Sequence, residues 1–112
     1  MNITPQQWNE PIVRNGGSFL QSWEWGALQE SAGHATWRLQ GKDWQALVLR
    51  YRLFSGLSYF YCPGGPVVER GEVGIRNQEV FKEFAEEVGR IAAKENCVFL
   101  KAEPYFIILL LP

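Results

Sequence analysis

Two oppositely charged residues, Lys101 and Glu103, stand near the end of an apolar run that is typical of a β-strand. Side chains two positions apart on a strand point to the same face of the sheet, so this pair can act together. On an exposed face the two would form a surface ion pair of little energetic value. On a binding surface they would orient a charged ligand instead, and the residues alone leave both interpretations open.

The segment SFLQSWEWG, which begins at Ser18, places an amide next to two indole rings. Ser18 followed by Gln21 three residues later fits a capping box, which predicts a helix that runs to about Ala32. Trp25 would then share a face with Gln21, and Trp23 would point elsewhere, toward the sheet. Gln21 and Trp25 are therefore candidates for ligand contact. The alternatives are a helix cap for Gln21 and a core position for Trp25.

The other reactive side chains are scattered along the chain. His34 has no Asp, Ser or Cys neighbour and is a weak candidate for a general base. Cys62 and Cys97 lack CxxC spacing, and with a single histidine they cannot complete a zinc site of Cys and His ligands, so we expect buried thiols in a reducing compartment. Arg50 and Arg52 share a strand face, where they would meet phosphate or only solvent. No nucleophile–base pair is evident, and the catalytic residues stay unassigned.

Composition limits the class of protein. The chain has 112 residues, 46% of them hydrophobic and 21% charged, with a net charge of −1, as expected for one globular domain without the basic field of a nucleic-acid binder. The N-terminus lacks the pattern of a signal peptide. The apolar FIILLL segment is far shorter than the ~20 residues that span a bilayer. We therefore expect a cytoplasmic protein with no metal and no transmembrane segment.

The elements that must position these residues follow from periodicity and from turn residues. Thr4 and Pro5 predict the start of a short first helix that ends by the turn at 15–17. Further helices are predicted over 18–32 and 77–95, with Asn77 as N-cap, and strands over 34–40, 47–53, 57–61 and 97–101. The strand at 47–53 alternates as if half-buried, and the prolines of 62–66 should break the sheet.

The predicted fold is α+β, with helices covering a mainly antiparallel sheet whose first three strands form a meander. The clearest helix carries an apolar stripe of Val80, Phe81, Phe84, Val88 and Ile91, and its charged residues, Glu83 among them, are expected to face solvent. The apolar tail beyond Pro104 has no evident partner. It reads as a buried element cut short, so the chain is expected to be incomplete.

Three segments together resemble the N-terminal lobe of the Fem-type (FemABX) peptidoglycan bridge-forming aminoacyltransferases. They are FLQSWEWGALQESAG, YFYCPGGPVV and VFLKAEP, and the usual family versions read close to FxQSxxWG, YxPRGPV and FLRxDP. Each motif is weak alone, but all three occur in order and the resemblance covers about residues 18–104. The chain departs from the pattern at three positions, where Gly64 and Lys101 replace arginines and Glu103 replaces an aspartate.

The resemblance implies a GNAT-like (N-acetyltransferase-like) lobe that fills residues 1–112, with a second lobe absent. Such enzymes transfer an amino acid from aminoacyl-tRNA to the stem-peptide amine of a precursor, UDP-MurNAc-pentapeptide or its lipid-linked form, without a metal or an organic cofactor. By the same resemblance, Glu103 and Lys101 would contact the precursor. Much of the transfer machinery would lie in the absent lobe, so the isolated chain is expected to be inactive.

Two other functions are compatible with the fold. A small acyl-CoA N-acetyltransferase would need an (R/Q)-x-x-G-x-(G/A) loop to hold a pyrophosphate at a helix N-terminus, and no stretch of the sequence fits it. A non-catalytic interaction module would use the FIILLL tail to self-associate, which size-exclusion behaviour would reveal.

Overall fold

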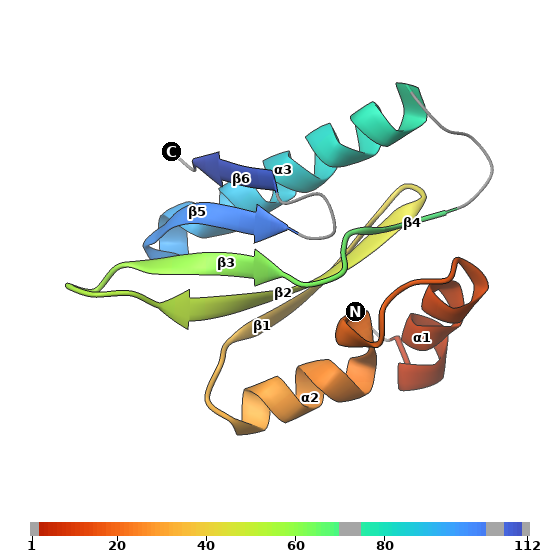
Figure 1. Cartoon of the computed structure of the whole chain (residues 1–112), viewed down its shortest axis with the longest axis horizontal. Coiled ribbons are helices and arrows are strands. Elements are labelled where there is room, and N and C mark those ends of the chain that lie inside the picture. The colour runs from red at the N-terminus through yellow and green to blue at the C-terminus, as the bar shows by residue number, and fades with distance from the viewer. Residues whose placement is uncertain (1–2, 70–74, 103–106, 111–112) are drawn as a thin grey trace.

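A computed structural model of the chain describes the backbone of residues 3–69, 75–102 and 107–110, and the side chains of residues 3–69 and 78–102. The helices are α1 (Pro5–Arg14), the 3-10 helix η1 (Phe19–Gln21), α2 (Trp23–Ser31) and α3 (Ile75–Glu95). The strands are β1 (Thr36–Gly41), β2 (Trp44–Arg52), β3 (Ser58–Cys62), β4 (Val67–Val68), β5 (Cys97–Ala102) and β6 (Ile107–Leu110). The predicted α+β class is confirmed, and the arrangement is consistent with a partial GNAT-like lobe (Figure 1).

The described strands form one sheet in the order β1-β2-β3-β5-β6, with β4 paired to β2. The first three strands are antiparallel, as the predicted meander requires. β5 runs parallel to β3 after the crossover through α3, and β6 pairs antiparallel with β5. The expectation that the apolar tail lacks a partner was therefore wrong, because Ile107–Leu110 completes the sheet edge. The pairing of β4 also shows that residues 62–66 interrupt the sheet only briefly.

Helices cover both faces of the sheet, with α1 and α2 on one face and α3 on the other (Figure 1). Consequently β2 is buried on both sides from Trp44 to Leu49, and the half-buried prediction was wrong for this part of the strand. The α3 face holds a core that includes Val48, Phe60 and Leu100. The opposite face holds a smaller core, here called the tryptophan-side core, made of Trp8, Ile12, Leu47, Leu49 and Val67.

Local sequence signals predicted the start of the first helix correctly but not that of the second. Thr4 caps α1 through a capping box with Gln7, and Pro5 stands at the first helical position, as predicted. The predicted capping box of Ser18 and Gln21 was wrong. The Ser18 hydroxyl accepts from the Leu20 amide at the head of η1, and the chain turns before α2 begins at Trp23. One continuous helix over 18–32 therefore does not form.

The long helix α3 carries the expected apolar stripe, because Val80, Phe84 and Val88 are buried against the sheet. Asn77 lies inside this helix, which begins at Ile75, so its prediction as N-cap was wrong. Glu83 is exposed, as expected, but it also makes structural contacts. Its carboxylate accepts hydrogen bonds from the Trp44 indole (2.9 Å) and the Lys42 amide (3.2 Å), which tie α3 to the β1–β2 turn.

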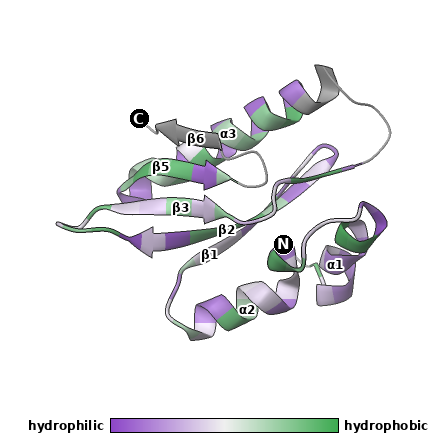
Figure 2. Cartoon of the chain, viewed as in Figure 1, coloured by the Kyte–Doolittle hydropathy of each residue, from purple (hydrophilic) through white to green (hydrophobic). Residues whose placement is uncertain are grey.

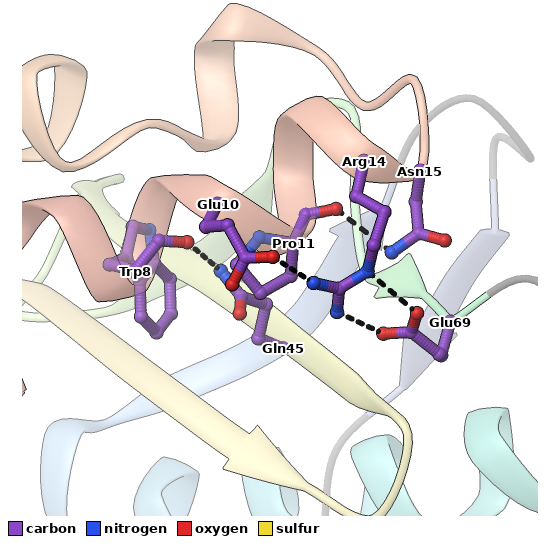
Figure 3. A network of polar contacts seen from close by, with 7 residues as sticks. All are labelled: Trp8, Glu10, Pro11, Arg14, Asn15, Gln45 and Glu69. Carbon is purple, nitrogen blue, oxygen red and sulfur yellow. Dashed lines mark hydrogen bonds and ion pairs between the residues drawn. The ribbon is translucent and has the colours of Figure 1, made fainter.

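A second set of polar contacts ties α1 to the sheet (Figure 3). The Gln45 side-chain amide donates to the Trp8 carbonyl at 2.7 Å in the interior. Nearer the surface, the Arg14 guanidinium donates two hydrogen bonds to the Glu69 carboxylate, at 3.0 and 2.8 Å, and also contacts Glu10. These contacts fix the C-terminal end of α1 over β2 and the residue that follows β4.

Candidate functional site

Gln21 is fully buried and its side-chain amide is fully engaged. Its Nε2 donates to the Pro63 carbonyl (2.7 Å) and the Leu47 carbonyl (3.1 Å), and its Oε1 accepts from the Leu47 amide (2.7 Å). One side chain thus joins η1 to the middle of β2 and to the loop after β3. In this fold Gln21 positions the backbone around it, and its amide keeps no free group for a ligand.

Gly64 and Gly65, in the loop after β3, lie so close to Ser18 and Gln21 that a larger residue would not fit at either position. A Cβ on Gly65 would lie 2.7 Å from Cδ and Oε1 of Gln21, so the buried amide needs glycine there. Gly64 has a φ of +72°, and a Cβ on it would lie 2.5 Å from the Cβ of Ser18. The position at which the related pattern carries arginine is therefore shaped for glycine in this chain.

Gly26 makes room for a part-buried contact between α2 and β1. The Arg38 guanidinium lies 3.8 Å from the centre of the Trp23 ring, and its Nη2 donates to the Trp23 carbonyl at 3.0 Å. A Cβ on Gly26 would lie 2.7 Å from that Nη2. Gly26 of the first motif therefore serves helix–sheet packing, by leaving room for the Arg38 guanidinium that stacks on Trp23.

Trp25 is half-buried, and its ring meets Phe19 edge-on at a centroid distance of 5.7 Å. Trp23 and Trp25 both pack against the tryptophan-side core, and Trp23 meets Arg38 of β1, in keeping with its predicted orientation toward the sheet. Trp25 also does not share a helical face with Gln21, because the chain leaves η1 at Ser22 with a ψ of 157°.

Lys101 lies on β5 directly beside Tyr61 of β3, in the parallel register. Its ammonium nitrogen is 5.5 Å from the centre of the Tyr61 ring, a cation–π arrangement, and the side chain is half-buried. Its predicted companion, Glu103, lies outside the described residues. Gln21 and Lys101 approach the same end of the sheet, because Pro63, which accepts from Gln21, follows Tyr61 by two positions.

Five aromatic side chains line up on the sheet face that Lys101 shares, and they are here called the aromatic row. The row consists of His34, Tyr51, Tyr59, Tyr61 and Phe99. Tyr51 contacts His34 (4.4 Å between ring centres), Tyr59 (5.6 Å) and Tyr61 (5.8 Å), and Tyr59 stacks on Phe99 at 4.8 Å. All five side chains are half-buried. Burial, and then the neighbouring Tyr59, raise the pKa of Tyr51, so its phenol is neutral at physiological pH.

The aromatic row follows β3 toward its carboxyl end, where Tyr61 meets Lys101. α1 and α2 pack over the same face, but their core contacts are to β2 and β4. The carboxyl ends of neighbouring parallel strands are a common position for ligands in open sheets. We therefore take Lys101 and the aromatic row together as the candidate site. The strand alternation of Tyr59 and Tyr61 was visible in the sequence, but the parallel register that adds Phe99 and Lys101 was not.

The candidate site offers binding groups rather than a catalytic pair. Within residues 3–69 and 78–102, no three His, Cys, Asp or Glu side chains gather to hold a metal. Both cysteines are free and buried, as predicted. Burial raises the pKa of the Cys62 thiol far above its usual value, and burial raises that of Cys97 to about 11, so neither is a thiolate nucleophile at neutral pH. His34 meets the ring of Tyr51 instead of a hydroxyl or thiol.

Comparison with known families gives one result. Residues 7–111 match the FemAB family, which implies peptidoglycan bridge synthesis by an aminoacyltransferase. Neither a curated protein nor a solved structure matches the chain significantly. In the part of the chain that the structure describes, no helix has the length and apolar character needed to cross a membrane.

Proposed function

Because the chain belongs to the FemAB family, we propose that it is a single N-terminal lobe, residues 1–112, which binds the cell-wall precursor for an aminoacyltransferase. In the proposed reaction the stem-peptide amine, once deprotonated, attacks the ester carbonyl of aminoacyl-tRNA. An amide bond forms, the ester bond breaks, and the tRNA 3′ or 2′ oxygen leaves with a proton. The acceptor would be UDP-MurNAc-pentapeptide or its lipid-linked form, in the cytoplasm.

The observation that supports a binding role is the cation at the end of the aromatic row. A precursor of this class carries diphosphate and carboxylate groups together with sugar and peptide surfaces. The Lys101 ammonium can pair with an anionic group, and the flat faces of Tyr59, Tyr61 and Phe99 can pack against a sugar ring or an aliphatic peptide side chain. Lysine supplies a point charge here rather than the bidentate fork of an arginine.

The remaining predicted residues divide into two proposed roles. Glu103, two residues beyond Lys101, would contact the cationic or hydroxyl groups of the precursor, and Trp25 would border the bound molecule. Gln21 would act indirectly, by holding the loop after β3 through its hydrogen bond to Pro63. Since the described residues hold no nucleophile–base pair, the lobe would bind the precursor but not transfer the amino acid.

The experiment is calorimetric titration of the chain with UDP-MurNAc-pentapeptide. We expect binding by the parent chain, weakened by about tenfold or more in Lys101→Ala and in Glu103→Ala because each removes a charged contact. Lys82→Ala is the matched control, since Lys82 is exposed on α3, on the opposite face of the sheet. No heat of binding from a folded parent, or equal weakening in Lys82→Ala, would refute the proposal.

A further inference from the structure

The β2–β3 hairpin ends in an exposed apolar tip, made of Leu53, Phe54 and Leu57. Phe54 is 73% exposed, Leu53 40% and Leu57 37%. The Leu53 amide donates to the Leu57 carbonyl at 2.8 Å, and the Leu57 amide donates to the Phe54 carbonyl at 3.0 Å. Ser55 and Gly56 have φ values of 54° and 77°, so the chain reverses tightly between them. The fold thus holds large apolar side chains out toward solvent.

Cationic side chains stand at the base of this tip. Arg52 is exposed and, in the described structure, makes no hydrogen bond or ion pair. Arg50 is half-buried and pairs with Glu95 at the end of α3. Figure 2 shows the hydrophilic end of β2 next to the hydrophobic tip. A pocket of about 380 Å³ is lined by both arginines, by Glu95, Ser58 and Asn96, and by Leu53 and Leu57 of the tip.

We propose that this hairpin docks the protein on the surface of an anionic phospholipid bilayer. The tip would enter the interface between headgroups and acyl chains, and Arg52 would pair with a lipid phosphate at the mouth of the pocket. The apolar tip and the adjacent Arg52 together fit a partner with an apolar interior and an anionic surface. The net charge of −1 gives the chain no general attraction to anionic surfaces, so docking depends on this local pair of features.

Two other partners fit the same residues less well. A second copy meeting tip to tip around a twofold axis would bring the same residues together, Arg52 near Arg52, and the like charges would repel. A free phosphate would meet the arginines but would leave Phe54 exposed to water. An anionic bilayer accounts for both the apolar tip and the neighbouring positive charge.

Docking through the tip would also orient the protein, because it fixes how far Lys101 stands from the bilayer surface. The tip precedes β3, whereas Lys101 lies beside Tyr61 near the other end of that strand. With a rise of about 3.3 Å per residue, the Lys101 end of the candidate site would stand roughly 15 Å from the docked tip, whereas the Tyr59 end of the aromatic row lies next to it. Precursor binding at Lys101 and bilayer docking at Phe54 can therefore be tested separately.

The test is co-sedimentation of the 112-residue chain with phosphatidylcholine vesicles that contain or lack phosphatidylglycerol. We expect binding that requires phosphatidylglycerol. It should weaken about tenfold or more in Phe54→Ser through the loss of inserted apolar surface. In Arg52→Gln it should weaken about fivefold through the loss of one cation. The matched control is Leu28→Ser, because Leu28 is 56% exposed on α2, away from the hairpin.

Far-UV circular dichroism and thermal melting would first establish that each variant is folded, as expected for changes at exposed positions. A folded parent that fails to sediment with phosphatidylglycerol vesicles would overturn the proposal. So would equal weakening by Leu28→Ser. Sedimentation velocity without vesicles supplies the last check, since a dimer that Phe54→Ser dissolves would assign the tip to a second copy instead.

Discussion

The two faces of the sheet are held in different ways. Under α3, the core consists of apolar side chains, Phe84, Val88 and Leu100 among them, and the Trp44 indole of this core also donates to the exposed Glu83. On the other face, the tryptophan-side core is interleaved with buried polar side chains. Gln21 bonds to β2 and to the loop after β3, and Gln45 bonds to the Trp8 carbonyl, while the Trp8 indole donates to the Gln21 carbonyl at 2.8 Å.

The two faces therefore differ in the kind of contact that holds them: mainly apolar packing under α3, and apolar packing with buried hydrogen bonds on the opposite face. Apolar contacts depend on volume and area, so several side chains can fill one position. Buried hydrogen bonds depend on the placement of each donor and acceptor, and a missing partner costs more than the net value of the bond. The tryptophan-side face should therefore define the geometry of the loop after β3, whereas the α3 face should mainly supply stability.

The largest effect is expected on the α3 face, at Phe84, which is 1% exposed and meets Trp44 at a centroid distance of 5.6 Å. Phe84→Ala should lower the free energy of unfolding by about 3–5 kcal/mol, because it leaves a cavity. Phe84→Leu should cost less than about 1.5 kcal/mol, because it keeps most of the volume. Urea unfolding followed by tryptophan fluorescence measures both. If leucine costs as much as alanine, this face also depends on specific geometry and the contrast fails.

A somewhat smaller effect is expected at Gln21, with the opposite pattern of tolerance. Gln21→Leu keeps the approximate volume but leaves the Leu47 amide and the Leu47 and Pro63 carbonyls without their partner. We expect a loss of about 2–4 kcal/mol from these unsatisfied groups. Gln6→Leu is the control, since Gln6 is exposed on α1 and should change stability by less than about 0.5 kcal/mol. A Gln21→Leu variant as stable as that control would show that the hydrogen bonds do not hold this face.

The same contrast explains which parts of the fold could be predicted from the sequence. The apolar residues of α3 recur every three or four positions, so the local sequence was enough to predict this helix and its buried face. The Gln21 contacts span 26 and 42 positions, and no local rule connects Gln21 to Leu47 or Pro63. The capping-box hypothesis gave Gln21 a structural role through the wrong partner, because a nearby serine was the only partner that sequence spacing could offer.

The candidate site shows the same limit. Lys101 could be selected from the sequence, since it ends an apolar strand and stands at a motif position. Its neighbour Tyr61 could not, because that contact depends on the parallel pairing of β3 with β5 across α3. Strand alternation placed Tyr59 and Tyr61 on one face, but only the register brings Phe99 and Tyr51 to them.

The smallest effect is expected at the protein surface near the tryptophan-side core, where Arg14 of α1 pairs with Glu69 (Figure 3). The Arg14 hydrogen bonds lower the pKa of Glu69 in the folded chain. The stabilisation from this contact is therefore complete above the unfolded-state pKa, about 4.3, and is lost as the pH falls through the lower folded-state value. Thermal melting at pH 7 and at pH 3 should show a slightly larger acid-induced loss in the parent than in Glu69→Gln.

The difference should be small and should shrink further in high salt, because both side chains are substantially exposed to solvent. Its size bears directly on the contrast between the two faces. If Glu69→Gln destabilised the chain as much as Gln21→Leu at pH 7, surface charge rather than buried amides would fix α1 against the sheet. If Glu69→Gln instead melts near the temperature of the parent at pH 7, the hydrogen bonds of Gln21 and Gln45 remain as the directional contacts that hold the face under α1 and α2.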